Sequence, residues 1–249
     1  MGGNIEADGS SYIEQGLNKV LVLITGPAEP PKKTSDVNEE KGNLFCHILN
    51  APFSGPDWRK RRIGDRKNSE MESNIVNAFE SVIMLELYPK SQIDIAVHII
   101  EADGSLLCTI INAVTLALMD AGISMTDMIC ACSCGTIKQN LCLDLNQTEQ
   151  NMASFFLPLA IKARTAEIIF IQLDSRLSVQ NLELALKTAT AGCRQICNLM
   201  EGAAVSAMVA VPQEGKMSNS SARKGERKKK QDGLVGDQVE DVNMDIVVS

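Results

Sequence analysis

Six cationic residues lie close together in a chain whose net charge is −7. They form the runs Arg59-Lys60-Arg61-Arg62 and Arg66-Lys67, which together we call the basic loop. Positive charge concentrated in one segment of an acidic chain indicates a polyanionic partner, most simply RNA or DNA. A merely solvated loop is the alternative. Trp58 precedes the loop and could either stack on a base or cover the edge of the core.

Alternating cysteines form a second group that could carry chemistry. Cys130, Cys132 and Cys134 fall on one face of a predicted strand, because successive strand side chains point to opposite faces of a sheet. A metal or redox site is one interpretation, and three small, buried, reduced residues are the other. The segment has no Cys-x-x-Cys pair, and His47 and His98 are remote in sequence. We therefore favour buried, reduced thiols and expect neither a metal nor a cofactor.

The composition predicts a large aliphatic core. Of the 249 residues, 45% are hydrophobic but only 4% are aromatic, which suffices for one large domain or two small ones. The first ten residues contain Glu6 and Asp8 and no apolar run, so we expect no secretory leader. No apolar run reaches the roughly 20 residues of a membrane span.

The composition changes beyond Val211, where polar and charged residues dominate. A segment of this kind buries too little apolar surface to offset its ordering entropy, so we expect it to be disordered. Its basic run, Arg223–Lys230, is interpreted as a nuclear-import signal, an RNA-contacting patch or part of a solvated tail.

Hydrophobic periodicity predicts strands and helices that alternate without strict βαβ order, which is typical of an α+β fold. The predicted strands are Ser10–Ile13, Lys19–Thr25, Phe45–Leu49, Ile93–Ile100, Ile129–Gly135, Leu141–Leu145 and Ile168–Leu173.

Three long helices are predicted to pack on these strands. The first begins at Ser69, which forms a capping box with Glu72. The second, Ser105–Ala121, is apolar nearly all round and is therefore buried, with Gly122 as its terminator. The last begins after Ser178, its N-cap. Its predicted buried face consists of Leu182, Ala185, Ala189, Cys193, Ile196 and Met200.

Several segments, taken in order, resemble one family. They read ADGSSYIEQG, NKVLVLITGP, PFSG with RKRR and GDRK, ELYPKSQIDI with EADGS, NAVTLALMDAGISMTDMICACS and LDLNQTE. Their number, order and spacing, from about Glu6 to about Met200, resemble the RNase PH family and its exosome subunits of the ribosomal-RNA-processing protein 41 type. The resemblance implies an RNase PH-like fold, similar to ribosomal protein S5 domain 2, with mixed sheets and buried helices. It implies a domain at residues 1–212 and a disordered charged tail at 213–249.

One departure from the family concerns the beginning of the chain. Relatives begin with an Arg-x-Asp-Gly-Arg pattern and a first strand, whereas this chain begins MGGNIEADGS. Since a missing strand would leave one edge of the first sheet unpaired, we expect an open edge there.

The resemblance also implies a chemistry for active relatives, in which phosphate attacks the 3′-terminal phosphodiester of RNA. Such relatives carry two acidic residues, matched here by Asp144 and by Gln150, and an amide cannot act as a general acid. Their phosphate-binding turn is Gly-Gly-Thr-Arg-like. Here Gly104 and Ser105 remain as vestigial phosphate contacts, while Leu107 replaces the arginine. A plain helix cap is the interpretation that we favour for Ser105.

The element that grips RNA in the family is kept. Asp65-Arg66-Lys67 matches its Asp-Arg-Arg or Asp-Arg-Lys pattern. RNA binding is therefore assigned to the basic side chains in and beside that element, because they can neutralise phosphates. These are Arg59, Arg61, Arg62, Arg66 and Lys67. No catalytic residue is expected, and Asp144 is interpreted as a relict.

The favoured hypothesis is a non-catalytic ring subunit of the RNA exosome that supports 3′–5′ RNA processing and degradation, including rRNA processing and mRNA decay. The resemblance implies RNA, other RNase PH-like subunits and S1/KH cap subunits as partners, no membrane, and a location in nucleus, nucleolus and cytoplasm. One alternative is an active phosphate-dependent 3′–5′ exoribonuclease. Another is a divergent paralogue outside the exosome, motivated by the missing N-terminal pattern.

Overall fold

The structure is a computed structural model that describes residues 7–29, 41–55, 58, 65–138 and 140–210. Of the predicted RNA contacts it describes Arg66 and Lys67, while Arg59, Arg61 and Arg62 lie outside the described residues. The tail from residue 211 onward also lies outside them. Within the described ranges, no helix is both long and apolar enough to cross a membrane.

The first sheet has four strands in the order β1-β2-β4-β3. They are β1 (Gly9–Gln15), β2 (Asn18–Ala28), β3 (Asn43–Asn50) and β4 (Gln92–Glu101). β2 lies antiparallel to both β1 and β4, whereas β3 runs parallel to β4. Buried aliphatic side chains alternate with more exposed ones along β2 and β4, so one face of this sheet covers the core.

Two helices pack on that buried face, α1 (Arg66–Glu80) and α2 (Leu106–Asp120). Ten of the fifteen α2 residues are buried because the helix lies between the first sheet and strand β5 (Ile129–Ile137) of the second. The Asn112 side chain bonds both backbone groups of Ala131 on β5, at 3.0 and 2.8 Å. The predicted central helix is thus confirmed, and Gly122 ends it with a φ of +68°.

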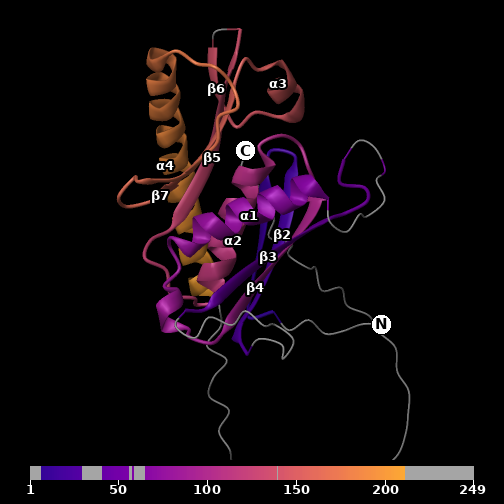
Figure 1. Cartoon of the computed structure of the whole chain (residues 1–249), viewed down its shortest axis with the longest axis vertical. Coiled ribbons are helices and arrows are strands. Elements are labelled where there is room, and N and C mark those ends of the chain that lie inside the picture. The colour runs from indigo at the N-terminus through magenta and orange to yellow at the C-terminus, as the bar shows by residue number, and fades with distance from the viewer. Residues whose placement is uncertain (1–6, 30–40, 56–57, 59–64, 139, 211–249) are drawn as a thin grey trace, which may run out of the picture.

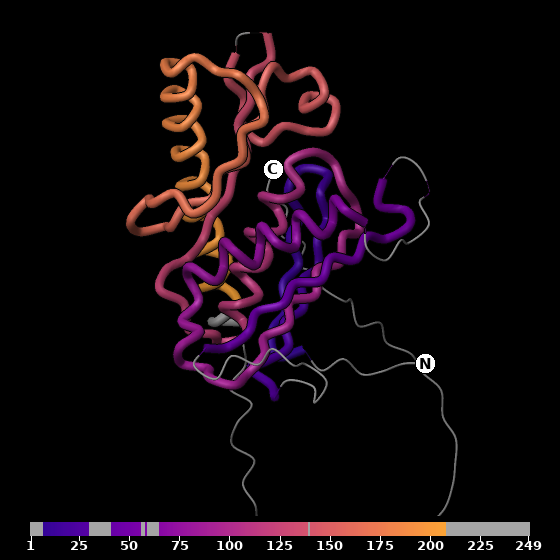
Figure 2. Tube along the Cα trace, in the orientation of Figure 1, coloured from indigo at the N-terminus to yellow at the C-terminus, as the bar shows by residue number. Residues whose placement is uncertain are grey.

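The second sheet has the order β6-β5-β7-β8 and is antiparallel throughout. Its other strands are β6 (Asn140–Leu143), β7 (Phe156–Lys162) and β8 (Ile168–Ile171). The long helix α4 (Val179–Ala210) packs on the face of this sheet opposite α2, beside β5 and β7 (Figure 1). Figure 2 traces the same path, from the first sheet through the second sheet to α4.

The three alternating cysteines of β5 do share one face. Cys130, Cys132 and Cys134 are buried against α4, where they contact a core that includes Ala189 and Cys193. Between them, β5 residues such as Ala131 face α2. Most of the predicted buried face of α4 is confirmed, since Ala185, Ala189, Cys193 and Met200 are buried and Ile196 packs against them, but Leu182 is only half-buried and lies outside this core.

Every predicted strand is present, but the structure corrects the predicted start of α1 and adds three elements. α1 begins at Arg66, with Asp65 as its N-cap, and not at Ser69. Ser69 instead donates its backbone N–H to the Asp65 carbonyl, 3.0 Å away. Glu72 accepts from the Ile48 N–H of β3 at 2.8 Å, so tertiary packing uses the side chain that a capping box would need. The three unpredicted elements are β7, the short helix α3 (Gln147–Met152) and the 3-10 helix η1 (Leu85–Leu87).

Candidate functional site

A buried asparagine holds the turn that precedes α2. Asn18 donates from Nδ2 to the Gly104 carbonyl and accepts at Oδ1 from the Asp103 N–H, both at 2.7 Å. Asn18 is only 3% exposed, so breaking either bond would leave a buried polar atom unpaired, which is unfavourable. The start of β2 therefore fixes the turn at Asp103–Ser105.

Gly104 lets this turn approach the segment that follows β6. Its φ is +35°, and a Cβ at this position would lie 2.3 Å from the Leu145 carbonyl oxygen and 2.6 Å from the Gln147 nitrogen. Asp103 adds a direct bond, accepting the Gln147 N–H at 2.9 Å. The two segments thus make a contact that only glycine permits.

Ser105 occupies the N-cap position of α2, as predicted, but its side chain caps nothing. Its hydroxyl lies 2.7 Å from the Leu145 carbonyl, to which it donates, and 2.5 Å from the Ser133 hydroxyl. No side-chain capping bond is present, and the residue adopts a left-handed conformation with φ of +52°. The hydroxyl therefore connects α2 to β5 and to the segment after β6.

The predicted catalytic relict lies beside this contact. Asp144 directly precedes Leu145, is exposed, and has a φ of +55°. Its backbone N–H bonds to the Ser133 carbonyl at 2.9 Å, which fixes its main chain to β5. The structure therefore places Asp144, the residue before Leu145, beside the turn of Gly104 and Ser105, although it lies far from them in sequence.

Leu107 and Gln150, which replace charged residues of the family, bring no charge to this site. Leu107 lies in the first turn of α2, half-buried, and packs against the main core. Gln150 lies on α3, also half-buried. α3 itself is fixed by a capping box in which Asn146 accepts the Glu149 N–H at 2.8 Å and Glu149 accepts the Asn146 N–H at 3.1 Å.

The described cations of the basic loop start α1. Arg66 and Lys67 are exposed in its first turn, which contains no acidic residue. Asn50, at the end of β3, bonds the Asn68 side chain at 3.2 Å and so links this turn to the sheet. Trp58 is 75% exposed, which does not support the interpretation that it covers the core.

The thiols of β5 are chemically quiet. Burial raises the pKa of Cys132 to about 12 and that of Cys134 to about 11. A thiol with so high a pKa stays protonated at neutral pH, and the protonated form is a poor nucleophile and a poor metal ligand. Among the described residues, no group of three or more His, Cys, Asp or Glu side chains could hold a metal ion.

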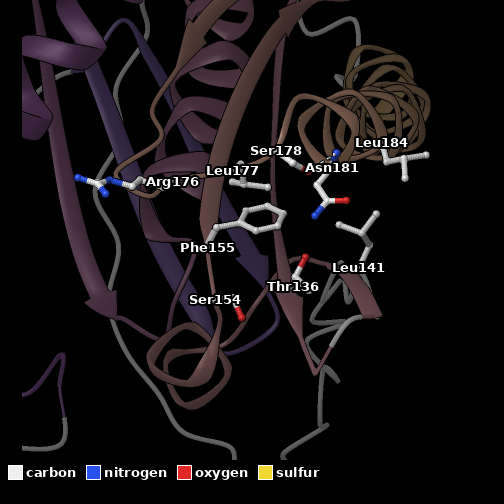
Figure 3. Close-up of a pocket in the computed structure, with 9 residues that line it drawn as sticks. All are labelled: Thr136, Leu141, Ser154, Phe155, Arg176, Leu177, Ser178, Asn181 and Leu184. Carbon is white, nitrogen blue, oxygen red and sulfur yellow. Dashed lines mark hydrogen bonds between the residues drawn. The ribbon is translucent and has the colours of Figure 1, made fainter.

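A cavity of about 520 Å³ lies at a different place, between the β5–β6 hairpin, the segment before β7 and the beginning of α4 (Figure 3). Phe155, Leu177 and the Asn181 amide point toward one another there. Of the predicted site residues that the structure describes, none lines this cavity. It is therefore separate from the site around Ser105 and Asp144.

Comparison with known protein families shows that two domains of a single family cover most of the chain. Residues 3–124 match domain 1 of the 3′ exoribonuclease family (RNase PH), and residues 127–192 match domain 2 of the same family. The chain belongs to the RNase PH family, and the sequence-based prediction of the family is confirmed.

Curated relatives and a solved structure refine the comparison. The chain is 38% identical to exosome complex component RRP41 of Mus musculus over 201 residues, covering 81% of this chain and 82% of that protein. It is 36% identical to exosome complex component ski6 of Schizosaccharomyces pombe over 196 residues, covering 79% and 80% respectively. The crystal structure of rice (Oryza sativa) Rrp46 superposes with a TM-score of 0.70 at 24% identity, covering 80% of this chain and 89% of that one. That structure confirms the predicted α+β, RNase PH-like fold.

Two residues of the site were not predicted from the sequence. Asn18 and Asp103 form the bonds that hold the turn before α2, but neither belongs to a spacing pattern that would reveal a partner so far away in sequence. For α3 there was a local signal, because Asn146 and Glu149 have the spacing of a capping box.

Proposed function

We propose that this chain is a ring subunit of an RNA exosome, which binds RNA and serves as a scaffold without catalysing phosphorolysis. The observation that carries the proposal is its 38% identity to an exosome complex component over 81% of this chain. The 201 matched residues exceed the length of either family domain, so the similarity to that component extends over both domains and is not confined to one site.

The site lacks two groups that phosphorolysis requires. Phosphorolysis needs a bound phosphate dianion and a proton donor for the departing 3′ oxygen. Leu107 brings no positive charge to the start of α2 and packs on the core, and Gln150 brings a neutral amide. Asp144 retains a carboxylate, but a single carboxylate cannot replace the missing phosphate ligand.

The cations at the start of α1 support RNA binding. Arg66 and Lys67 are exposed in the first turn of α1, and neither forms an ion pair with another described residue, so their charges can meet phosphates. The partners we propose are RNA, other RNase PH-like subunits and S1/KH cap subunits. The location we propose is nucleus, nucleolus and cytoplasm.

Native mass spectrometry of the tagged chain, purified gently from its own cells, tests the proposal. We expect a stoichiometric assembly with other RNase PH-like and S1-domain subunits. A monomer or homo-oligomer without those partners would contradict the exosome assignment and favour a divergent paralogue.

The second candidate function, an active exoribonuclease, is favoured only by the retained Asp144. It predicts phosphate-dependent release of nucleoside diphosphates from a 3′ end of RNA by the purified assembly. The measurement compares release with and without inorganic phosphate, and a Asp144→Asn variant serves as the matched control. Release that requires both phosphate and Asp144 would overturn the non-catalytic proposal.

A further inference from the structure

Phe53 is a large apolar side chain left in solvent. It is 61% exposed, in the turn that follows β3. Isolated exposed apolar residues are common on protein surfaces and need no explanation by themselves. The significance of Phe53 therefore depends on how its backbone is held and on what surrounds it.

The turn that carries Phe53 is fixed on both sides. Ala51 donates its N–H to the Ile99 carbonyl at 2.9 Å, and Ser54 donates to Ala51 at 3.0 Å. The Ser54 carbonyl in turn accepts the Ala102 N–H at 2.9 Å. Ala102 immediately precedes the turn at Asp103–Ser105, so the backbone of the turn that carries Phe53 is hydrogen-bonded to the segment that leads into the candidate site.

The same end of the first sheet carries the described cations. Asn50, three residues before Phe53, bonds Asn68 in the first turn of α1 at 3.2 Å. Arg66 and Lys67 occupy that turn. An exposed aromatic ring, two exposed cations and the turn before α2 are thus joined by backbone and side-chain bonds within a few residues of one another.

We propose that Phe53 stacks on a base of single-stranded RNA while Arg66 and Lys67 contact its phosphates. This inference rests on the proposed RNA-binding function and adds a contact to it. Proteins that bind single strands combine a cationic surface with aromatic side chains, because every base presents a π-face. Phe53 offers no hydrogen-bonding group, so it accepts any base, and bases already stacked inside a duplex are inaccessible to it. A rigid turn favours binding, because little conformational entropy is lost when the base docks.

The test uses the assembled complex containing this chain. Fluorescence anisotropy measures the Kd for a single-stranded 12-nucleotide RNA and for a blunt-ended RNA duplex, each over a series of salt concentrations. Phe53→Ala is expected to weaken single-strand binding about tenfold, within the range for loss of one stacked base. Its salt dependence should not change, because no phosphate contact is lost. Duplex binding should also not change.

Two further substitutions separate stacking from other roles. Phe53→Trp keeps an aromatic face and should bind the single strand like the wild type, whereas Phe53→Leu keeps apolar surface without it and should bind as weakly as Phe53→Ala. Leu87→Ala is the matched control. Leu87 is nearly as exposed as Phe53, at 60%, but it lies before the start of β4. The turn of Phe53 bonds Ala102, which follows the end of β4, so the control residue lies at the other end of that strand. It should have no effect on either RNA.

Four results would overturn the proposal. Wild-type affinity in Phe53→Ala would exclude the stacking contact. If the double variant Arg66→Ala with Lys67→Ala then still showed a reduced salt dependence, the proposed RNA-binding function itself would stand. Wild-type affinity in Phe53→Leu would replace stacking with simple apolar contact. Loss of the assembled complex in the Phe53 variants, seen by native mass spectrometry, would show that the Phe53 side chain lies in an interface between subunits and does not contact RNA. A wild-type complex that binds neither RNA would overturn both the stacking contact and the proposed RNA-binding function.

Discussion

Arg66 and Lys67 stand where helix electrostatics disfavours them. The N-terminal end of a helix carries partial positive charge, so a cation in the first turn is destabilising and an acidic residue is the usual choice. α1 has no acidic residue there and no side-chain cap. Asp65, at the N-cap, is the nearest acidic residue and makes no side-chain bond to the helix. The exposed charges of Arg66 and Lys67 are thus open to an external anion, in agreement with the proposed RNA contact.

The corresponding prediction concerns both side chains together. Arg66→Ala with Lys67→Ala should weaken RNA binding and lower the magnitude of the slope of log Kd against log salt by about 1.4, because each lost phosphate contact with a single strand contributes about 0.7. α1 itself should become slightly more stable, since alanine is a better residue for the first turn than an uncompensated cation. Anisotropy titrations at several salt concentrations provide the measurement.

An exposed cation far from α1 is the control for this double variant. Lys187 lies on α4 and pairs with Glu183 at 2.7 Å, and Lys187→Ala should leave the slope unchanged. An unchanged slope in the Arg66/Lys67 variant would mean that the start of α1 has a purely structural role.

At the scale of elements, the join between the start of α2 and the segment after β6 depends on one glycine. Gly104→Ala would place a Cβ 2.3 Å from the Leu145 carbonyl oxygen at a φ of +35°. Both the overlap with backbone and the left-handed conformation are unfavourable, so we expect the free energy of unfolding to fall by more than about 2 kcal/mol. Urea-induced unfolding followed by circular dichroism measures the change.

A second glycine supplies the opposite expectation. Gly202 lies in α4, where an added Cβ would meet nothing within 4 Å. Gly202→Ala should therefore raise stability by up to about 1 kcal/mol, because alanine favours the helix and reduces the freedom of the unfolded chain. If both variants had the same effect, close packing at Gly104 would not be the cause.

The elements that sequence reasoning found and missed differ in how local their causes are. The strands of the first sheet were predicted because apolar and polar residues alternate along them, and α2 was predicted because its apolar run is long and nearly continuous. β7 was missed because Leu157 and the residues after it are buried on both faces and show no alternation. α1 was begun too late because Ser69 and Glu72 have capping-box spacing, while the actual partner of Glu72 is the backbone of β3, far away in sequence. The bonds of Asn18 and Ser105 are equally non-local, so no pattern of residue spacing could reveal them.

At the scale of the whole molecule, the second sheet separates two cores. One core lies between the sheets around α1 and α2, and the other lies between the second sheet and α4. The second core is rich in thiols contributed by Cys130, Cys132 and Cys134 from β5 and by Cys193 and Cys197 from α4. Small side chains there let α4 approach closely, as at Gly192, where a Cβ would lie 3.0 Å from the Cys132 sulfur.

Because of the buried thiols, the free energy of unfolding of the chain should depend on pH in the alkaline range. Burial raises the pKa of Cys132 and of Cys193 from 9.0 to about 12. In the unfolded chain these thiols lose their protons near pH 9, while in the folded chain they keep them. The unfolded state then binds fewer protons, so the free energy of unfolding should fall as pH rises from about 9 toward the folded pKa, and it should be unaffected by these groups below that window.

Comparison of variants isolates this effect from the lysines and tyrosines that also titrate in the same range. Urea unfolding of the reduced protein, measured between pH 7.5 and 10.5, should show a smaller alkaline decline in Cys132→Ala than in the wild type. Cys132→Ala will also be less stable at every pH, because it removes a buried sulfur, but only the slope against pH bears on the thiol. Equal slopes in the two proteins would show that the thiol of Cys132 stays protonated or becomes solvated without affecting folding, and the alkaline loss of stability would then belong to other groups.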